Sequence, residues 1–195
     1  MEISTQDIQQ LRESMGVGIM DAKKALLEAA GDIKNAEKIL EVKGAKSAEK
    51  RASKETHEGR VGEYVHANGK EAGLVAVACE TDFVALTDDF KNLAHDLALH
   101  VVAMKPKYLK PEDVPADVLA EEEQIWKKQL TEEGKPEKIF ENILKGKRQK
   151  FFSEVCFLKQ QYVKDDSQTI EDIMTSAITK LGENIQITGF SFLTL

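Results

Sequence analysis

Two strand-like segments separated by Asn68-Gly69 constrain the fold of this chain more than any other feature. Asn-Gly favours the left-handed backbone of a tight hairpin turn. Residues 61–67 lead into this turn, and residues 74–79 return from it as a run that is apolar on both faces. Such a run is typical of a central strand that is covered on both sides. The sequence therefore predicts an antiparallel hairpin, with its second strand inside a sheet.

Helical periodicity accounts for most of the remaining core. Thr87 is suited to cap a helix whose apolar residues recur at intervals of three and four, and residues 170–181 carry a second such stripe. Two more helices are expected over about 119–130 and 136–150, and residues 185–195 close the chain as a strand. The simplest assembly is of class α+β, with a small antiparallel sheet of about three strands packed by helices.

The first 44 residues are expected to form three short helices. Ser4 or Thr5 would cap the first helix, Gly31 would end the second, and Gly44 would end the third. A bundle of this size is marginally stable alone and is typical of a docking module. Residues 45–60 are polar; their interleaved glutamates favour a solvated tether over a basic strip for RNA. The expected domains are a helical module at 1–44, a linker at 45–60 and an α+β core at 61–195.

Composition restricts the possible functions. The net charge of −7 disfavours nonspecific binding to nucleic acid, because a polyanion would be repelled. The two cysteines, Cys79 and Cys156, lie among apolar residues and are expected to be buried free thiols. No apolar run reaches the length of a membrane helix, and the first residues lack the pattern of a signal peptide. A cytoplasmic protein without membrane or direct nucleic-acid contacts is expected.

The residue types needed for a chemical step do not occur in a suitable pattern. The chain contains no GxxxxGK[ST] phosphate loop, and Gly16-Val17-Gly18 lacks the preceding strand of a dinucleotide site. The histidines lack metal-ligand spacing, and no nucleophile is paired with a base. We therefore expect no cofactor, no bound metal and no enzymatic activity.

Two segments remain as candidates for contact with a partner. Thr81-Asp82-Phe83-Val84 follows the apolar strand and places a carboxylate beside a large aromatic side chain at the strand's exit. A strand end would hold this pair rigidly, which suits a protruding wedge. Alternatively, Phe83 is a core aromatic and Asp82 caps the next helix. Ile19-Met20 is likewise either bundle core or a contact surface, and the residues alone do not decide between these readings.

Several segments of the chain match one family in the same order. They are Leu11–Leu26, Gly31-Asp32-Ile33, Glu133–Ile139, Phe152–Leu158 and Lys180–Ile185, together with Thr81–Val84. In these segments the chain resembles bacterial elongation factor Ts. The resemblance covers nearly the whole chain, so chance is a poor explanation.

The resemblance implies a guanine-nucleotide exchange factor for elongation factor Tu that promotes GDP release. Its three-helix module would be similar to ubiquitin-associated domains and would dock on the GTPase. The wedge would act near the nucleotide and dislodge the Mg²⁺ bound there. In relatives of this compact type two copies can pair, so the resemblance implies a possible homodimer and a core that is also a dimerisation domain. The implied docking residues are Leu11, Arg12, Ile19 and Met20, and the implied Mg²⁺-dislodging residues are Thr81, Asp82, Phe83 and Val84.

Some positions depart from the family pattern. Met15 stands where a Thr is usual, Ala22 replaces a common Cys, and Leu86-Thr87 replaces a basic residue and Asn. These changes affect details of contact but leave Asp82 and Phe83 in place. The main alternative function is a ubiquitin-associated-like adaptor that binds a partner without changing its nucleotide release. A metabolic enzyme is a third reading, for which no clustered site is present in the sequence.

Overall fold

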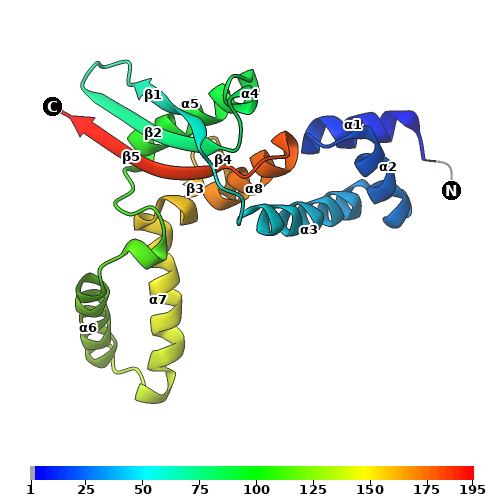
Figure 1. The fold of residues 1–195 in the computed structure, drawn as a ribbon. Coiled ribbons are helices and arrows are strands. Elements are labelled where there is room, and N and C mark those ends of the chain that lie inside the picture. Colours follow the sequence, from blue (N-terminus) through cyan, green and yellow to red (C-terminus); the bar gives the residue numbers. More distant parts are fainter. Residues whose placement is uncertain (1–2) are drawn as a thin grey trace.

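The computed structural model describes residues 3–195 and has three parts (Figure 1). A module of helices α1–α3 lies to one side of a central sheet with its helices, and the hairpin of α6 and α7 projects away from the sheet. The class is α+β, as predicted. The longer helices are α1 (Thr5–Met15), α2 (Ile19–Glu28), α3 (Ile33–Arg51), α5 (Asp88–Met104), α6 (Ala116–Glu132), α7 (Phe140–Val155) and α8 (Ile170–Leu181).

Local caps define the helical module. The Ser4 hydroxyl accepts a hydrogen bond from the Asp7 amide at 3.0 Å, and Asp32 does the same for Asn35 at 3.0 Å. Gly16 ends α1 with φ of 63°, a left-handed conformation that glycine adopts without strain. The three helices enclose a small apolar core of their own, made of Leu11, Ala22, Ala25, Leu26, Ala36 and Leu40.

The third helix is longer than predicted. It passes through Gly44 and ends at Arg51, so that only residues 52–57 connect it to the sheet. Gly44 is a packing glycine rather than a helix stop, because a Cβ there would lie 2.8 Å from the Thr179 hydroxyl oxygen of α8. The expected linker is therefore partly helical, and its helical part carries Ala48, which packs against the main core.

The sheet has the predicted three antiparallel strands, in the order β1 (Glu58–Val65), β2 (Glu71–Cys79) and β5 (Gln186–Thr194). Gly69 has φ of 66° within the short link between β1 and β2. The smaller elements are α4 (Asp82–Ala85), the 3₁₀ turns Pro111–Asp113, Glu137–Ile139 and Phe157–Lys159, and a second, unpredicted two-stranded sheet of β3 (Gln161–Tyr162) and β4 (Asp165–Thr169).

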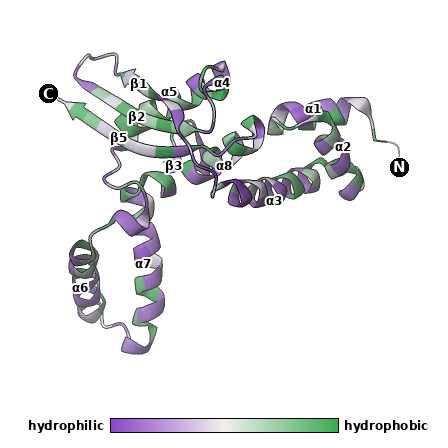
Figure 2. Ribbon diagram, in the orientation of Figure 1, coloured by the Kyte–Doolittle hydropathy of each residue, from purple (hydrophilic) through white to green (hydrophobic). Residues whose placement is uncertain are grey.

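Residues 3–195 cover only one face of the three-stranded sheet, contrary to the expectation for residues 74–79. Helix α5 lies behind the sheet in Figure 1 and packs on Val75 and Val77 of β2. It approaches β1 so closely that a Cβ at Gly62 would lie 2.1 Å from the Ala94 carbonyl oxygen. On the opposite face, Leu74 of β2 is exposed. The alternation is hidden in the sequence because the residues of β2 on this face, such as Leu74 and Ala76, are also apolar, and Figure 2 shows β2 as mostly hydrophobic along its length.

The projecting hairpin of α6 and α7 has a separate core. Trp126 and Leu130 of α6 and Leu144 of α7 are buried there. Both helices were predicted, but α7 continues to Val155, beyond the expected end near Lys150. None of the helices in the described residues is long and apolar enough to cross a membrane.

His100 is a structural residue of the core. It is buried, its ring stacks on Phe157 with centroids 5.5 Å apart, and its Nδ1 accepts a hydrogen bond from the Val163 amide at 3.2 Å. Its Nε2 then donates to the side-chain amide oxygen Oε1 of Gln160 at 3.0 Å, so the neutral ring satisfies both partners. Burial lowers the pKa of His100.

Cys79 and Cys156 are buried free thiols, as predicted.

Candidate partner-binding site

The predicted wedge forms a single helical turn directly after β2. Helix α4 begins at Asp82, and Thr81 caps it by accepting a hydrogen bond from the Val84 amide at 3.4 Å. Asp82 therefore occupies the first turn, where a carboxylate is favoured, while Thr81 rather than Asp82 is the cap. The strand exit thus leads into a short, capped turn on the surface.

The four residues of the wedge divide between surface and interior. Phe83 is 80% exposed, and Asp82 beside it is also exposed. Val84 packs against the main core, and the next residue, Ala85, is buried. Phe83 is thus an aromatic ring presented to solvent, and the core-aromatic alternative is wrong. The ring and the neighbouring carboxylate are both accessible at the surface.

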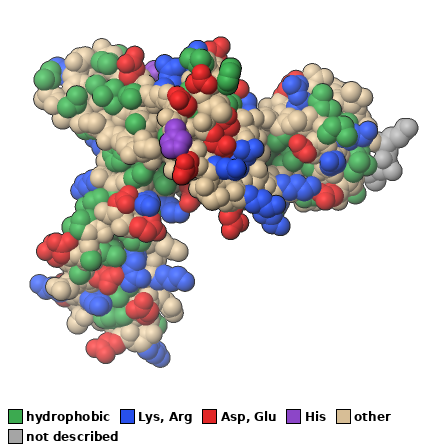
Figure 3. Space-filling model, viewed as in Figure 1, with side chains coloured by type: hydrophobic (Ala, Val, Ile, Leu, Met, Phe, Trp, Pro, Cys, Tyr) green, Lys and Arg blue, Asp and Glu red, His purple; other side chains and the backbone are tan. Residues whose placement is uncertain are grey.

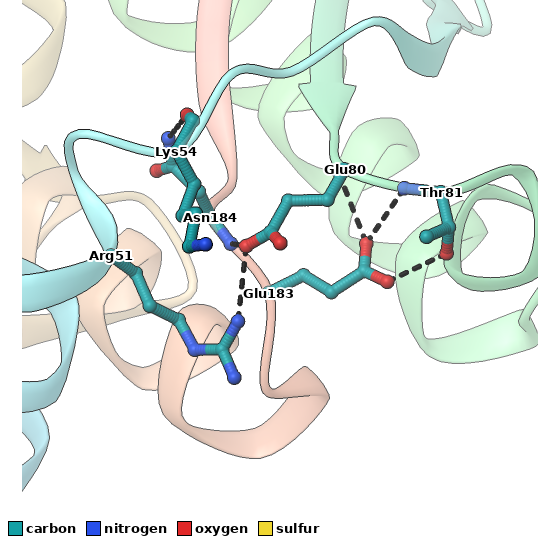
Figure 4. Close-up of polar contacts among 6 residues, drawn as sticks. All are labelled: Arg51, Lys54, Glu80, Thr81, Glu183 and Asn184. Carbon is teal, nitrogen blue, oxygen red and sulfur yellow. Dashed lines mark hydrogen bonds and ion pairs between the residues drawn. The ribbon is translucent and has the colours of Figure 1, made fainter.

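Two carboxylates hold the start of this turn, as Figure 4 shows. Glu183 accepts hydrogen bonds from the backbone amides of Glu80 and Thr81 at 3.1 and 3.0 Å, and from the Thr81 hydroxyl at 2.6 Å. Glu80 in turn accepts from the Asn184 amide at 2.6 Å and from Arg51 at 3.0 Å. These contacts join α3, the exit of β2 and the segment after α8.

The electrostatics of the cluster favour ionised Glu80. The hydrogen bond from the Asn184 amide, together with the Arg51 guanidinium, holds the pKa of Glu80 below its ordinary value despite some desolvation. An ionised Glu80 accepts both bonds at any pH near neutrality.

A second exposed surface lies on the helical module. Ile19 and Met20, at the start of α2, are 58% and 61% exposed, and Arg12 of α1 is also exposed. Leu27, two turns after Met20 along α2, is exposed as well and is not among the residues that the sequence pointed to. Figure 3 shows hydrophobic side chains on the surface of this module. Ile19 and Met20 are therefore not bundle core.

Leu11 requires a correction. It is completely buried among the helices of the module, so its side chain does not reach a partner's surface. The resemblance grouped it with Arg12, which is next to it in sequence but points outward. Leu11 supports the module from within, and it is removed from the set of contact residues.

The module is held against the core at more than one place. Helix α3 packs along α8, and a Cβ at Gly16 would lie 3.1 Å from the Lys180 side chain of α8. Lys180 also forms an ion pair with Asp89 of α5 at 2.7 Å. Both exposed surfaces thus belong to elements that are connected through α8 and its C-terminal end.

Within residues 3–195, no group of three or more His, Cys, Asp or Glu side chains is arranged to hold a metal ion.

Three residues to which the sequence assigned no role contact the start of the wedge. They are Glu183, Asn184 and Arg51. Glu183 and Asn184 lie in Lys180–Ile185, one of the segments that carry the resemblance, and this was the only feature of the sequence that pointed to them. Leu86, directly after α4, is a further exposed apolar side chain three residues after Phe83.

Comparison with known proteins places the chain in a family. The family model described as elongation factor TS matches residues 6–195. A protein of Fervidobacterium nodosum named elongation factor Ts is 47% identical over 190 residues, covering 97% of this chain and 96% of the relative. One of the same name from Thermotoga maritima is 49% identical over 191 residues, covering 98% and 95% respectively. The chain therefore belongs to the elongation factor Ts family of translation elongation factors.

Proposed function

We propose that this protein is the guanine-nucleotide exchange factor for elongation factor Tu, and that it acts by protein contact without a chemical step of its own. The observation that carries the proposal is the exposed Phe83, presented beside Asp82 on a capped turn in a chain of this family. The capped turn provides the rigidity that a wedge needs, because a flexible aromatic would lose entropy on insertion.

The proposed mechanism is displacement of the Mg²⁺ that accompanies the nucleotide in the partner. Mg²⁺ requires nearly ideal octahedral geometry, so a small shift of its surroundings weakens its hold. Burial of one Phe side chain contributes about 1.5–3 kcal/mol. Each ~1.4 kcal/mol of coupling changes nucleotide affinity tenfold. Insertion of Phe83, with Asp82 next to it, would therefore weaken GDP binding by one to two orders of magnitude.

Coupling of this kind is reciprocal. A factor that weakens GDP binding must itself be bound less tightly by the GDP form of its partner. The protein would therefore accelerate GDP release and then be displaced by the incoming nucleotide. It would leave the equilibrium of the free partner between GDP and GTP unchanged, because it is regenerated in each cycle.

We also propose that the helical module docks the protein on the GTPase. Arg12, Ile19 and Met20 form the docking surface, with Leu27 as an addition, and their exposure supports this role. Exposed apolar residues beside a basic side chain are typical of contact surfaces. The module at 1–44 would supply affinity, and the core at 61–195 would supply the wedge.

Release of fluorescent GDP from elongation factor Tu at increasing concentrations of this protein tests the function. We expect saturable acceleration, described by a maximal rate and a half-saturating concentration. An adaptor would bind the same partner without changing the rate of GDP release. Binding without acceleration would therefore contradict the exchange function and support the adaptor.

The open face of the sheet supports a homodimer. Leu74 at its centre is exposed, as are Val61 and Val65 of β1 and Leu193 of β5. In the register of the sheet, Val61 pairs with Ala76, Val65 with Ala72, and Ala72 with Leu193, so these side chains share one face. A flat apolar face of this kind is suited to pack on its own copy. We propose that two copies pair through it.

A charge on this face should separate the two copies. Leu74→Glu would bury an unpaired carboxylate in each half of the interface, which costs several kcal/mol. Sedimentation equilibrium should give a dimer for the wild type and a monomer for the variant. A wild type that sediments as a monomer at micromolar concentration, or a variant that remains dimeric, would contradict pairing through this face.

A further inference from the structure

The backbone at the start of the wedge depends on a side chain from the other end of the sequence. Strand β2 ends at Cys79, and the next two amides, of Glu80 and Thr81, both donate to Oε2 of Glu183. The Thr81 hydroxyl donates to the other oxygen, Oε1, at 2.6 Å. One carboxylate thus satisfies three donors at the point where the chain leaves the sheet.

This contact determines how Thr81 caps α4. The hydroxyl has one hydrogen, which it gives to Glu183, so that a lone pair is free to accept from the Val84 amide. The Thr81 carbonyl accepts from the Cys79 thiol at 3.2 Å and the Ala85 amide at 3.3 Å. Helix α4 has four residues, and a helix of this length does not form without such anchors.

Glu183 is itself held in place. Gly182 ends α8 in the left-handed conformation, with φ of 73°, and turns the chain towards the exit of β2. The next residue, Asn184, donates its backbone amide to Glu80 at 2.6 Å and its side-chain amide to the Lys54 carbonyl at 2.7 Å. Figure 4 shows the resulting reciprocal arrangement, in which each segment supplies a carboxylate to the other's backbone.

We propose that Glu183 is a positioning residue for nucleotide exchange: it fixes Thr81 and thereby the direction in which Phe83 projects. The proposal rests on the exchange function proposed above. Glu183 lies outside the docking surface of Arg12, Ile19 and Met20, so its role is to orient the wedge after docking. Its loss should lower the maximal rate of GDP release and leave the half-saturating concentration unchanged.

The test compares Glu183→Ala, Glu183→Gln and a matched control, Glu171→Ala, which removes an exposed glutamate at the other end of α8 whose carboxylate pairs with Lys159. Glu183→Ala should lower the maximal rate about tenfold, equivalent to ~1.4 kcal/mol, with the half-saturating concentration changed less than about twofold. Glu183→Gln should recover part of the rate, because its amide oxygen still accepts from the backbone. Glu171→Ala should match the wild type.

A double variant distinguishes positioning from a general effect. If Glu183 acts only through the wedge, adding Glu183→Ala to Phe83→Ala should cause no further loss of rate. Multiplicative losses would overturn the proposal, as would a raised half-saturating concentration with an unchanged maximal rate. If Glu183→Ala does not fold, the same comparisons are made with Glu183→Gln.

Hydrogen exchange of the free protein tests positioning without the partner. The Val84 amide does not touch Glu183, but it donates to the Thr81 hydroxyl that Glu183 orients. Glu183→Gln should make this amide exchange faster, while amides within β2 keep their protection. Unchanged Val84 protection would overturn the proposal. If the wild-type protein failed to accelerate GDP release from elongation factor Tu, the exchange function would be contradicted. The hydrogen-exchange measurement would still decide whether Glu183 orients the wedge.

Discussion

Replacing Phe83 with alanine should slow GDP release from elongation factor Tu at saturating concentrations of this protein by about tenfold to a hundredfold. The estimate follows from the ~1.5–3 kcal/mol that burial of an aromatic side chain contributes, converted to a rate. The ring is 80% exposed in the free protein, so its removal deletes no contact that holds the fold together. The measurement is stopped-flow release of fluorescent GDP, fitted for the maximal rate and the half-saturating concentration.

Ile19→Ala provides the matched control for this experiment. It also removes an exposed apolar side chain, but from the docking surface. We expect it to raise the half-saturating concentration and to leave the maximal rate unchanged, the reverse of Phe83→Ala. Thermal unfolding of both variants should match the wild type, because exposed substitutions change stability by about 0.5 kcal/mol or less. A maximal rate that Phe83→Ala leaves intact would contradict the wedge mechanism.

The largest expected effect on stability comes from Gly62→Ala. A Cβ at this position would lie 2.1 Å from the Ala94 carbonyl oxygen and 2.3 Å from the carbonyl carbon, so the obstacle is the backbone of α5. A flexible side chain would move aside, but relieving this overlap requires the helix to separate from the sheet. We expect a loss of at least ~3 kcal/mol in the free energy of unfolding, measured by urea denaturation.

Gly146→Ala is the control of opposite sign. Gly146 lies inside α7, is exposed, and would place a Cβ within 4 Å of no other group. Alanine should therefore stabilise the protein by about 0.5–1 kcal/mol through its higher helix propensity. A Gly62→Ala variant that unfolds at the same urea concentration as the wild type would show that α5 does not approach β1 as closely as described.

The sequence was sufficient where a signal is local. The Thr87 cap, the stripe of residues 170–181 and the three antiparallel strands depend on periodicity and turn chemistry, and all are present in the structure. Errors arose where tertiary packing decides. Gly44 was interpreted as a helix stop because nothing in its neighbourhood reveals Thr179, which packs on it.

The candidate site was only partly predictable for the same reason. Phe83 follows an apolar strand, so a protrusion was a possible inference, but its exposure needed the structure. Leu11 and Arg12 are adjacent in sequence, but one is buried and the other exposed on the same helix, which a matched segment does not distinguish. Glu183 is an acidic residue after a helix, a pattern that usually indicates a solvated loop, and its three donors come from a distant strand exit.

The most direct test of the exchange mechanism is the acceleration of GDP release by the wild-type protein at millimolar Mg²⁺ and again after Mg²⁺ has been chelated. At millimolar Mg²⁺ we expect a large, saturable acceleration. After chelation the acceleration should become small, because the step that the wedge promotes has already taken place. No acceleration at millimolar Mg²⁺ would contradict the exchange function, and an equal acceleration under both conditions would contradict the displacement of Mg²⁺.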